Sequence, residues 1–236
     1  MKSADRPPAD PIAAALAAVR SRIEAACARC GRDLRTVTLV AVSKTKPAAD
    51  VVRAVDAGHS VFGENRVQEA LAKQAEVDRD VEWHLVGALQ RNKARHAVGA
   101  FKLLHGVDDS KLLVEIDRRA AAKGIRQPLL LQVRVGDESS KSGVDPAGLS
   151  ALVDEAARLD HIELRGLMTI PPPVEQPEHA RHGFARLREL RDAEAARSGI
   201  DLPELSMGMS GDFEVAVEEG ATLVRVGTAI FGSRDR

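Results

Sequence analysis

The sequence of 236 residues contains no tyrosine, which excludes any mechanism that needs a phenol as acid or base. It also lacks long apolar runs. No stretch approaches the ~18 residues that a membrane-spanning helix requires, and the opening MKSADRPPADP has no apolar core of a signal peptide. Charges nearly cancel, at a net −1, so nothing indicates nucleic acid or an anionic membrane as the main partner. We therefore expect a cytoplasmic protein.

Cysteine is scarce, with two residues in a C-x-x-C spacing, Cys27 and Cys30. A zinc site needs four ligands, and no second pair or nearby histidines supply them. A thioredoxin-like motif opens a helix, whereas this one closes a helix. Both cysteines continue an apolar stripe at helical spacing that comprises Ile12, Leu16, Val19 and Ile23. We expect both thiols to be small core side chains.

The chain is long enough for one large domain. Residues 1–9 are expected to be a disordered tail. A helix then begins, because Asp10 can cap it and Pro11 suits its first turn. It is expected to run to about Cys30 and to end at Gly31.

Short apolar runs then alternate with amphipathic helical patterns. Strands are expected near 37–43, 60–63, 82–87, 102–107, 128–135, 162–168, 204–208 and 222–227. Helices are expected near 47–57, 66–77, 92–98, 110–123, 146–159, 178–198 and 212–219. Several strands are almost wholly apolar, as in parallel sheets that are covered on both faces.

Eight such units predict that residues 10–236 form a single (β/α)₈ barrel of the TIM type, with an extra N-terminal helix and no second domain. An open doubly wound sheet is the alternative, but no G-x-G-x-x-G follows the first strand. Too few residues follow the eighth strand for a full outer helix. We expect the N-terminal helix to occupy that place in the outer ring.

Barrel sites lie at the carboxyl ends of strands, and the first strand leads directly into Lys44. An apolar surrounding lowers the pKa of a lysine, which makes its neutral amine available to form an imine. The alternative is a lysine that extends into solvent. Lys46 precedes a proline and is expected to point into solvent.

The end of the eighth strand carries Gly227 and Thr228, followed by a short helical turn whose amides could bind an anion. The seventh strand ends in the segment 206–210 (SMGMS), which supplies the hydroxyls of Ser206 and Ser210. Closure of the barrel places the eighth strand between the seventh and the first. A phosphate held there would lie beside Lys44, although the glycines could equally serve tight turns.

Other polar side chains lie at or near strand ends. Arg225 lies within the apolar eighth strand and must find an acceptor, either in a structural ion pair or in a cavity. Asn65 follows the second strand, and His84 lies in the third, where a core histidine is the ordinary interpretation. Met168 ends the sixth strand, where it either packs or touches a ligand ring. Lys141 lies in the polar loop after the fifth strand, which is either exposed or part of the mouth.

Seven segments together resemble one known family: AVSKTKP, FGENRVQEA, HLVGALQRNK, SKSGV, RGLMTI, LSMGMSGDFEVAVEEG and VRVGTAIFG. They are similar, in the family's order and across nearly the whole chain, to the pyridoxal phosphate homeostasis proteins. The resemblance implies a barrel like the N-terminal domain of alanine racemase. It also implies that the chain binds pyridoxal 5′-phosphate (PLP).

The resemblance further implies roles for particular residues. Lys44 matches the family's Schiff-base lysine, and Arg225 matches the arginine that faces the pyridine nitrogen. Ser206, Gly227 and Thr228 match its phosphate binders. Further expected cofactor contacts are Asn65, His84, Met168 and Met209. Gly211 stands where bacterial relatives often carry an aspartate, which puts a side-chain role at that position in doubt but not the cofactor site.

The family is regarded as a PLP carrier or regulator that balances vitamin B6 and amino-acid pools, with no assigned turnover. PLP-dependent apoenzymes are its expected recipients, and a monomer is the expected state. Arg225 cannot keep the ring nitrogen protonated as a carboxylate does, so carbanion stabilisation is weak. Three alternatives stay open: a weak PLP-dependent racemase or transaminase, a class I aldolase-like enzyme in which Lys44 binds a sugar phosphate, and an interaction module with a vestigial pocket.

Overall fold

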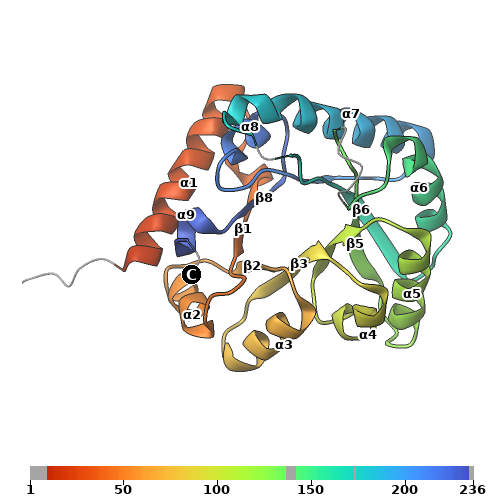
Figure 1. Ribbon diagram of the computed structural model, residues 1–236, viewed down its shortest axis with the longest axis horizontal. Helices are drawn as coiled ribbons and strands as arrows, with labels where there is room; N and C mark the ends of the chain where they lie inside the picture. The colour runs from red at the N-terminus through yellow and green to blue at the C-terminus, as the bar shows by residue number, and fades with distance from the viewer. Residues whose placement is uncertain (1–9, 137–141, 173, 234–236) are drawn as a thin grey trace, which may run out of the picture.

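The computed structural model describes residues 10–136, 142–172 and 174–233. Its eight parallel strands form a closed barrel in the order β1 to β8 (Figure 1). The strands are β1 (Thr38–Val42), β2 (Val61–Glu64), β3 (Glu82–Ala88), β4 (Leu103–Val107), β5 (Gln127–Gln132), β6 (Ile162–Met168), β7 (Glu204–Ser206) and β8 (Leu223–Val226). The TIM-type prediction is confirmed. The expected tail at 1–9 and Lys141 lie outside the described residues.

Helices surround this barrel, and each strand is followed by at least one of them. They are α1 (Pro11–Cys30), α2 (Ala48–Asp56), α3 (Val67–Glu76), α4 (Ala94–Ala97), α5 (Ser110–Ala121), α6 (Leu149–Ala157), α7 (Arg181–Ser198), α8 (Phe213–Glu218) and α9 (Thr228–Phe231). Short 3₁₀ turns at Arg91–Lys93, Pro146–Gly148 and Pro177–Ala180 lead into α4, α6 and α7, and another, Leu34–Thr36, precedes β1.

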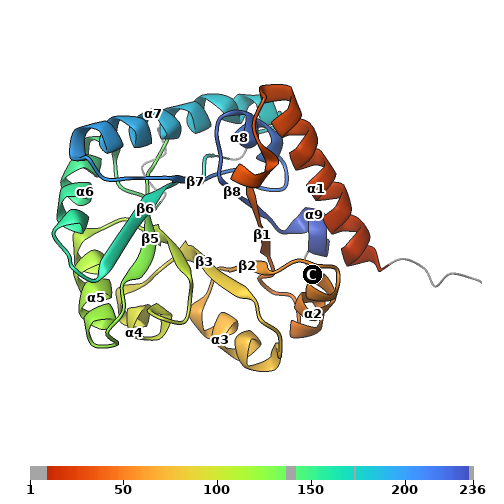
Figure 2. The same cartoon turned by 180° about the vertical axis from the view of Figure 1, so that it is seen from behind.

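The N-terminal helix α1 lies in the outer ring beside the short α9, between α2 and α8 (Figures 1 and 2). The Asp10 carboxylate accepts the Ile12 amide at 2.8 Å, and Gly31 ends the helix in the left-handed region at φ 69°. Arg22 of α1 pairs with Glu214 of α8 at 2.8 Å. The predicted caps and the predicted place of this helix are both confirmed.

The two cysteines differ, which corrects part of the sequence prediction. Cys27 is buried in the core, as expected, but Cys30 is exposed. The stripe turns outward at the last residue of α1, where Gly31 diverts the chain. Cys30 Sγ is instead within hydrogen-bond distance of Ala26 O, at 3.2 Å.

Apolar side chains occupy both faces of the sheet, as the almost wholly apolar strands predicted. A large core lies between the strands and the helices. A smaller one fills the inside of the barrel and consists of Val40, Val42, Val86, Leu103, Leu130, Met168 and Leu223. In the described part of the chain, no helix combines the length and the apolar character that crossing a membrane requires.

The seventh strand is shorter than predicted. It ends at Ser206 instead of residue 208, because Gly208 adopts a φ of 88° and turns the chain. A Cβ on Gly208 would lie 2.6 Å from the Cβ of Ala216, so this close turn requires glycine. Because β7 ends early, Ser210 and not Ser206 reaches the mouth of the barrel.

Candidate functional site

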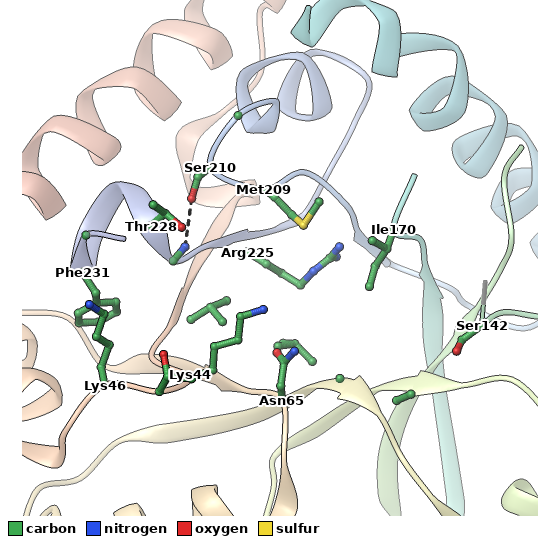
Figure 3. A pocket seen from close by; sticks show the side chains of 18 of the residues that line it. Lys44, Lys46, Asn65, Ser142, Ile170, Met209, Ser210, Arg225, Thr228 and Phe231 are labelled. Atoms are coloured by element: carbon green, nitrogen blue, oxygen red, sulfur yellow. Dashed lines mark hydrogen bonds between the residues drawn. The ribbon is translucent and has the colours of Figure 1, made fainter. Parts of the chain in front are cut away.

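A cavity of about 500 Å³ opens at the carboxyl ends of the strands. This volume is in the range of small-molecule sites, roughly 300–1,000 Å³. Side chains from β1, β2, β8 and their following loops point into it (Figure 3). It is lined by Val42, Lys44, Thr45, Lys46, Asn65, Val86, Gly87, Ala88, Gln132, Ser142, Ile170, Met209, Ser210, Gly211, Arg225, Gly227, Thr228, Phe231 and Gly232.

Lys44 enters this cavity from the turn that follows β1, and its side chain extends toward Arg225 (Figure 3). The next residue, Thr45, adopts a φ of 65°, a strained value for a β-branched residue. Its amide donates to the Glu69 carboxylate. The helix after β2 therefore holds the turn that presents Lys44.

A buried ion pair between Lys73 and Glu64 holds the residue before Lys44. Lys73 Nζ lies 2.5 Å from Glu64 Oε1 and donates to Ser43 O at 2.8 Å. The Ser43 hydroxyl also donates to Glu64 Oε1, at 2.7 Å. Burial raises the pKa of the Glu64 carboxyl, and the two hydrogen bonds oppose that rise. Lys44 thus follows a residue that is fixed through both its carbonyl and its hydroxyl.

The opposite wall of the cavity is built from the turn after β8. Gly227 and Thr228 line the cavity at the start of α9. The Ser210 hydroxyl accepts from the amides of Gly227 and Ala229, both at 3.3 Å (Figure 3). A Cβ on Gly227 would lie 3.1 Å from Val42 O. The two amides hold the Ser210 oxygen, which leaves the hydroxyl proton of Ser210 available to an anion at this end of the cavity.

Arg225 is 4% exposed and reaches the cavity from inside the barrel. Its Nη1 donates to Ser206 Oγ at 2.6 Å, and its Nη2 donates to Thr169 O at 2.9 Å. Burial lowers the pKa of its guanidinium to about 10. The group stays charged at neutral pH and acts as a hydrogen-bond donor.

The structure brings six of the nine sequence-predicted site residues to the cavity: Lys44, Asn65, Met209, Arg225, Gly227 and Thr228. It places three elsewhere. Ser206 is fully buried and bonds Arg225. His84 is 2% exposed and contacts another histidine. Met168 belongs to the core inside the barrel.

Sequence reasoning missed other lining residues. Lys46 was expected to point into solvent, but it lines the cavity and donates to Ser233 O at 2.9 Å. Of the two serines that the sequence offered after the seventh strand, Ser210 and not Ser206 contacts the turn after β8. Phe231 lines the cavity from α9, and its place three residues after Thr228 could have indicated this.

Known proteins resemble this chain over nearly its full length. The family model for the alanine racemase N-terminal domain matches residues 15–235. A pyridoxal phosphate homeostasis protein of Aquifex aeolicus is 46% identical over 220 residues, which is 93% of this chain and 96% of the relative. One from Pseudomonas aeruginosa is 46% identical over 225 residues, 95% of this chain and 96% of the relative. The chain belongs to the pyridoxal phosphate homeostasis protein family.

Solved structures place this member of the pyridoxal phosphate homeostasis family among barrels of the same fold. PipY of Synechococcus elongatus, solved both without PLP and with PLP bound, is 42% identical, with a TM-score of 0.84 over 94% of this chain and 100% of PipY. D-threonine aldolase from Filomicrobium marinum, at 17% identity and a TM-score of 0.76, shares the fold over 94% of this chain and 60% of its own.

Proposed function

We propose that this chain holds PLP as a Schiff base on Lys44 and acts in intracellular PLP (vitamin B6) and amino-acid homeostasis as a carrier or regulator. One observation carries the proposal. A single cavity joins a lysine amine, a buried charged arginine, and a hydroxyl with backbone amides. Relatives that bear the homeostasis name, and PipY with PLP bound, support it.

The donor set suits the chemical groups of PLP. An aldehyde needs an amine, which Lys44 supplies. A phosphate dianion needs donors, which Ser210, Gly227 and Thr228 supply at the start of α9. The pyridine nitrogen needs a donor that leaves it neutral, which Arg225 supplies. Ser206 then acts indirectly, by holding the guanidinium through the 2.6 Å bond.

A carrier suits these residues better than a racemase. When bound, PLP supplies an electron-withdrawing ring, and that ring is a strong electron sink only when its nitrogen is protonated. Arg225, with a pKa of about 10, is a donor that cannot accept a proton at neutral pH. No tyrosine exists to act as a second base. The proposal includes a monomer in the cytoplasm that delivers PLP to apoenzymes.

The test is a PLP titration followed by visible absorbance, with wild type, Lys44→Ala and Lys46→Ala compared. Lys46 lines the same cavity two residues away, so it is the matched control for a nonspecific lysine adduct. We expect a saturable band in wild type and Lys46→Ala, and none in Lys44→Ala. A band that survives Lys44→Ala, or no band in any of them, contradicts the proposal.

Adding amino acids to the loaded protein separates carrier from enzyme. A carrier shows at most a reversible spectral change, whereas a racemase or transaminase forms product over many turnovers. An aldolase-like protein shows no PLP band and reacts with a sugar phosphate under borohydride. A vestigial module shows neither. Transfer is measured as reactivation of a PLP-dependent apoenzyme beyond the rate with an equal amount of free PLP.

A further inference from the structure

A chain of hydrogen-bonded side chains crosses the inside of the barrel. It starts at Glu82, the first residue of β3, whose carboxylate Oε1 lies 2.8 Å from His84 Nε2. His84 Nδ1 lies 3.0 Å from His105 Nε2, on β4. His105 Nδ1 lies 2.8 Å from Ser206 Oγ, on β7, which in turn accepts from Arg225. We call Glu82, His84, His105 and Ser206 the column.

The column joins opposite ends of the barrel. Glu82 lies at the amino end of its strand with a side chain 43% exposed, whereas Arg225 lines the cavity at the carboxyl ends. The members between them are buried: His84 is 2% exposed, and His105 and Ser206 are 0% exposed. Val86 and Leu103 of the inner core lie two residues from His84 and His105 on the same strands, and therefore on the same face of the sheet. Hydrogen bonds in such surroundings are strong and polarise one another.

The hydrogen-bonding roles of its two ends favour one direction for the bonds in the column. The Arg225 guanidinium is a donor only, so Ser206 Oγ accepts from it and can donate its own proton to His105 Nδ1. His105 then carries its proton on Nε2 and donates to His84 Nδ1. His84 likewise carries its proton on Nε2 and donates to the Glu82 carboxylate, which accepts only.

The charges favour the same arrangement. Burial is the largest cause that lowers the pKa of His105 well below its usual value, and the Arg225 charge adds to it, so this ring stays neutral. The hydrogen bond from His84 lowers the pKa of Glu82, with a smaller contribution from Lys102, so this carboxyl stays charged. The two acceptors of Arg225 are uncharged, and the Asp212 carboxyl acts on it through space. The negative charge of Glu82 therefore favours protons that point toward it along each bond of the column, away from Arg225.

We propose that the column positions Arg225, with Glu82 at the far end of the barrel orienting both histidines and thereby the Ser206 hydroxyl that holds the guanidinium. Its members are positioning residues, and Glu82 is a remote one. The inference rests on the proposed function in that Arg225 is taken to meet the ring of PLP. The tautomers themselves do not depend on any ligand.

The first test is nitrogen-15 NMR of the histidine rings in the PLP-free protein. The expected result at neutral pH is a proton on Nε2 of both His84 and His105. Because burial lowers the pKa of His105, its ring shifts should stay constant from neutral to mildly acidic pH. Glu82→Ala removes the terminal acceptor, and we expect the ring shifts of both histidines to move. A proton on Nδ1 of His105 in wild type overturns the assignment.

The second test asks whether the far end of the barrel affects the cavity. Glu82→Ala is compared with Glu163→Ala, another half-exposed carboxylate near the amino end of a strand that lies outside the column. We expect PLP to bind Glu82→Ala about tenfold more weakly, as for loss of one charged hydrogen bond, with unchanged affinity in Glu163→Ala.

Equal affinities of Glu82→Ala and Glu163→Ala contradict the positioning role. A circular dichroism melt of each variant, run alongside, separates a loss of affinity from a loss of folding. If wild type itself binds no PLP, the proposed function fails, while the nitrogen shifts still decide whether the column exists as assigned. The two failures are thus distinguishable.

Discussion

Replacing Lys73 with methionine breaks the buried ion pair beneath the turn that carries Lys44. The Lys73 side chain is 5% exposed and its partner Glu64 is 0% exposed. The variant keeps the volume but leaves the Glu64 carboxylate with one donor, Ser43. Removing one partner of such a pair costs about 3–5 kcal/mol, because the other charge stays buried. The carbonyl of Ser43 also loses its donor.

The assay is urea unfolding of wild type and Lys73→Met, followed by circular dichroism. The control, Arg118→Met, breaks an exposed pair with Glu115, in which the arginine side chain is 61% exposed. We expect it to cost at most ~1 kcal/mol. The double variant Glu64→Gln, Lys73→Met removes the stranded charge and should recover part of the stability. A Lys73→Met cost no larger than that of the control refutes the reasoning.

The same variant has a signature in pH. Without Lys73, the folded pKa of Glu64 is raised further above its unfolded value, because burial is opposed by one hydrogen bond fewer. The loss of stability caused by the buried Glu64 carboxylate is then complete above its folded pKa, and it vanishes as pH falls below its unfolded pKa. The stability gap between Lys73→Met and wild type should therefore narrow in acid. A gap that widens in acid contradicts the assignment of the cost to this carboxylate.

Two further predictions concern groups away from the cavity. Burial is the main cause that lowers the pKa of His59 to about 4. The stability that the neutral ring contributes is therefore complete above its unfolded pKa and falls as pH drops toward 4, by about 3 kcal/mol in urea unfolding. His59→Gln should lack this loss, and an equal loss in that variant contradicts the prediction. Cys30 is exposed, whereas Cys27 is buried with a pKa raised by burial. One thiol per native chain should therefore react quickly with a disulfide reagent, and Cys30→Ser should abolish that reaction. Two fast thiols in wild type would contradict the structure.

The sequence predicts most strands and helices to within one or two residues, because their apolar runs are bounded by glycine, proline and capping residues. It also predicts Lys44, Gly227 and Thr228 at the cavity. Barrel topology alone places residues that follow strands 1 and 8 side by side. These features depend on the local sequence pattern and on the closure of the barrel, which makes the first and the last strand neighbours.

Features that depend on the ends of strands or on distant partners are not accessible in this way. Ser206 and Ser210 are four residues apart, and only the turn at Gly208 decides which of them reaches the cavity. His105 meets a serine 101 positions away. A histidine within the apolar run LLHGV was the available signal, since a buried polar side chain must find a partner.

The most direct measurement of the central claim is borohydride reduction of the PLP-loaded protein, followed by peptide mapping by mass spectrometry. Reduction makes a Schiff base permanent and marks the lysine that formed it. We predict that the added mass of reduced PLP lies on Lys44, and that Lys44→Ala yields no marked peptide. The mark on Lys46 or another lysine instead, or no mark after loading with PLP, would contradict the account.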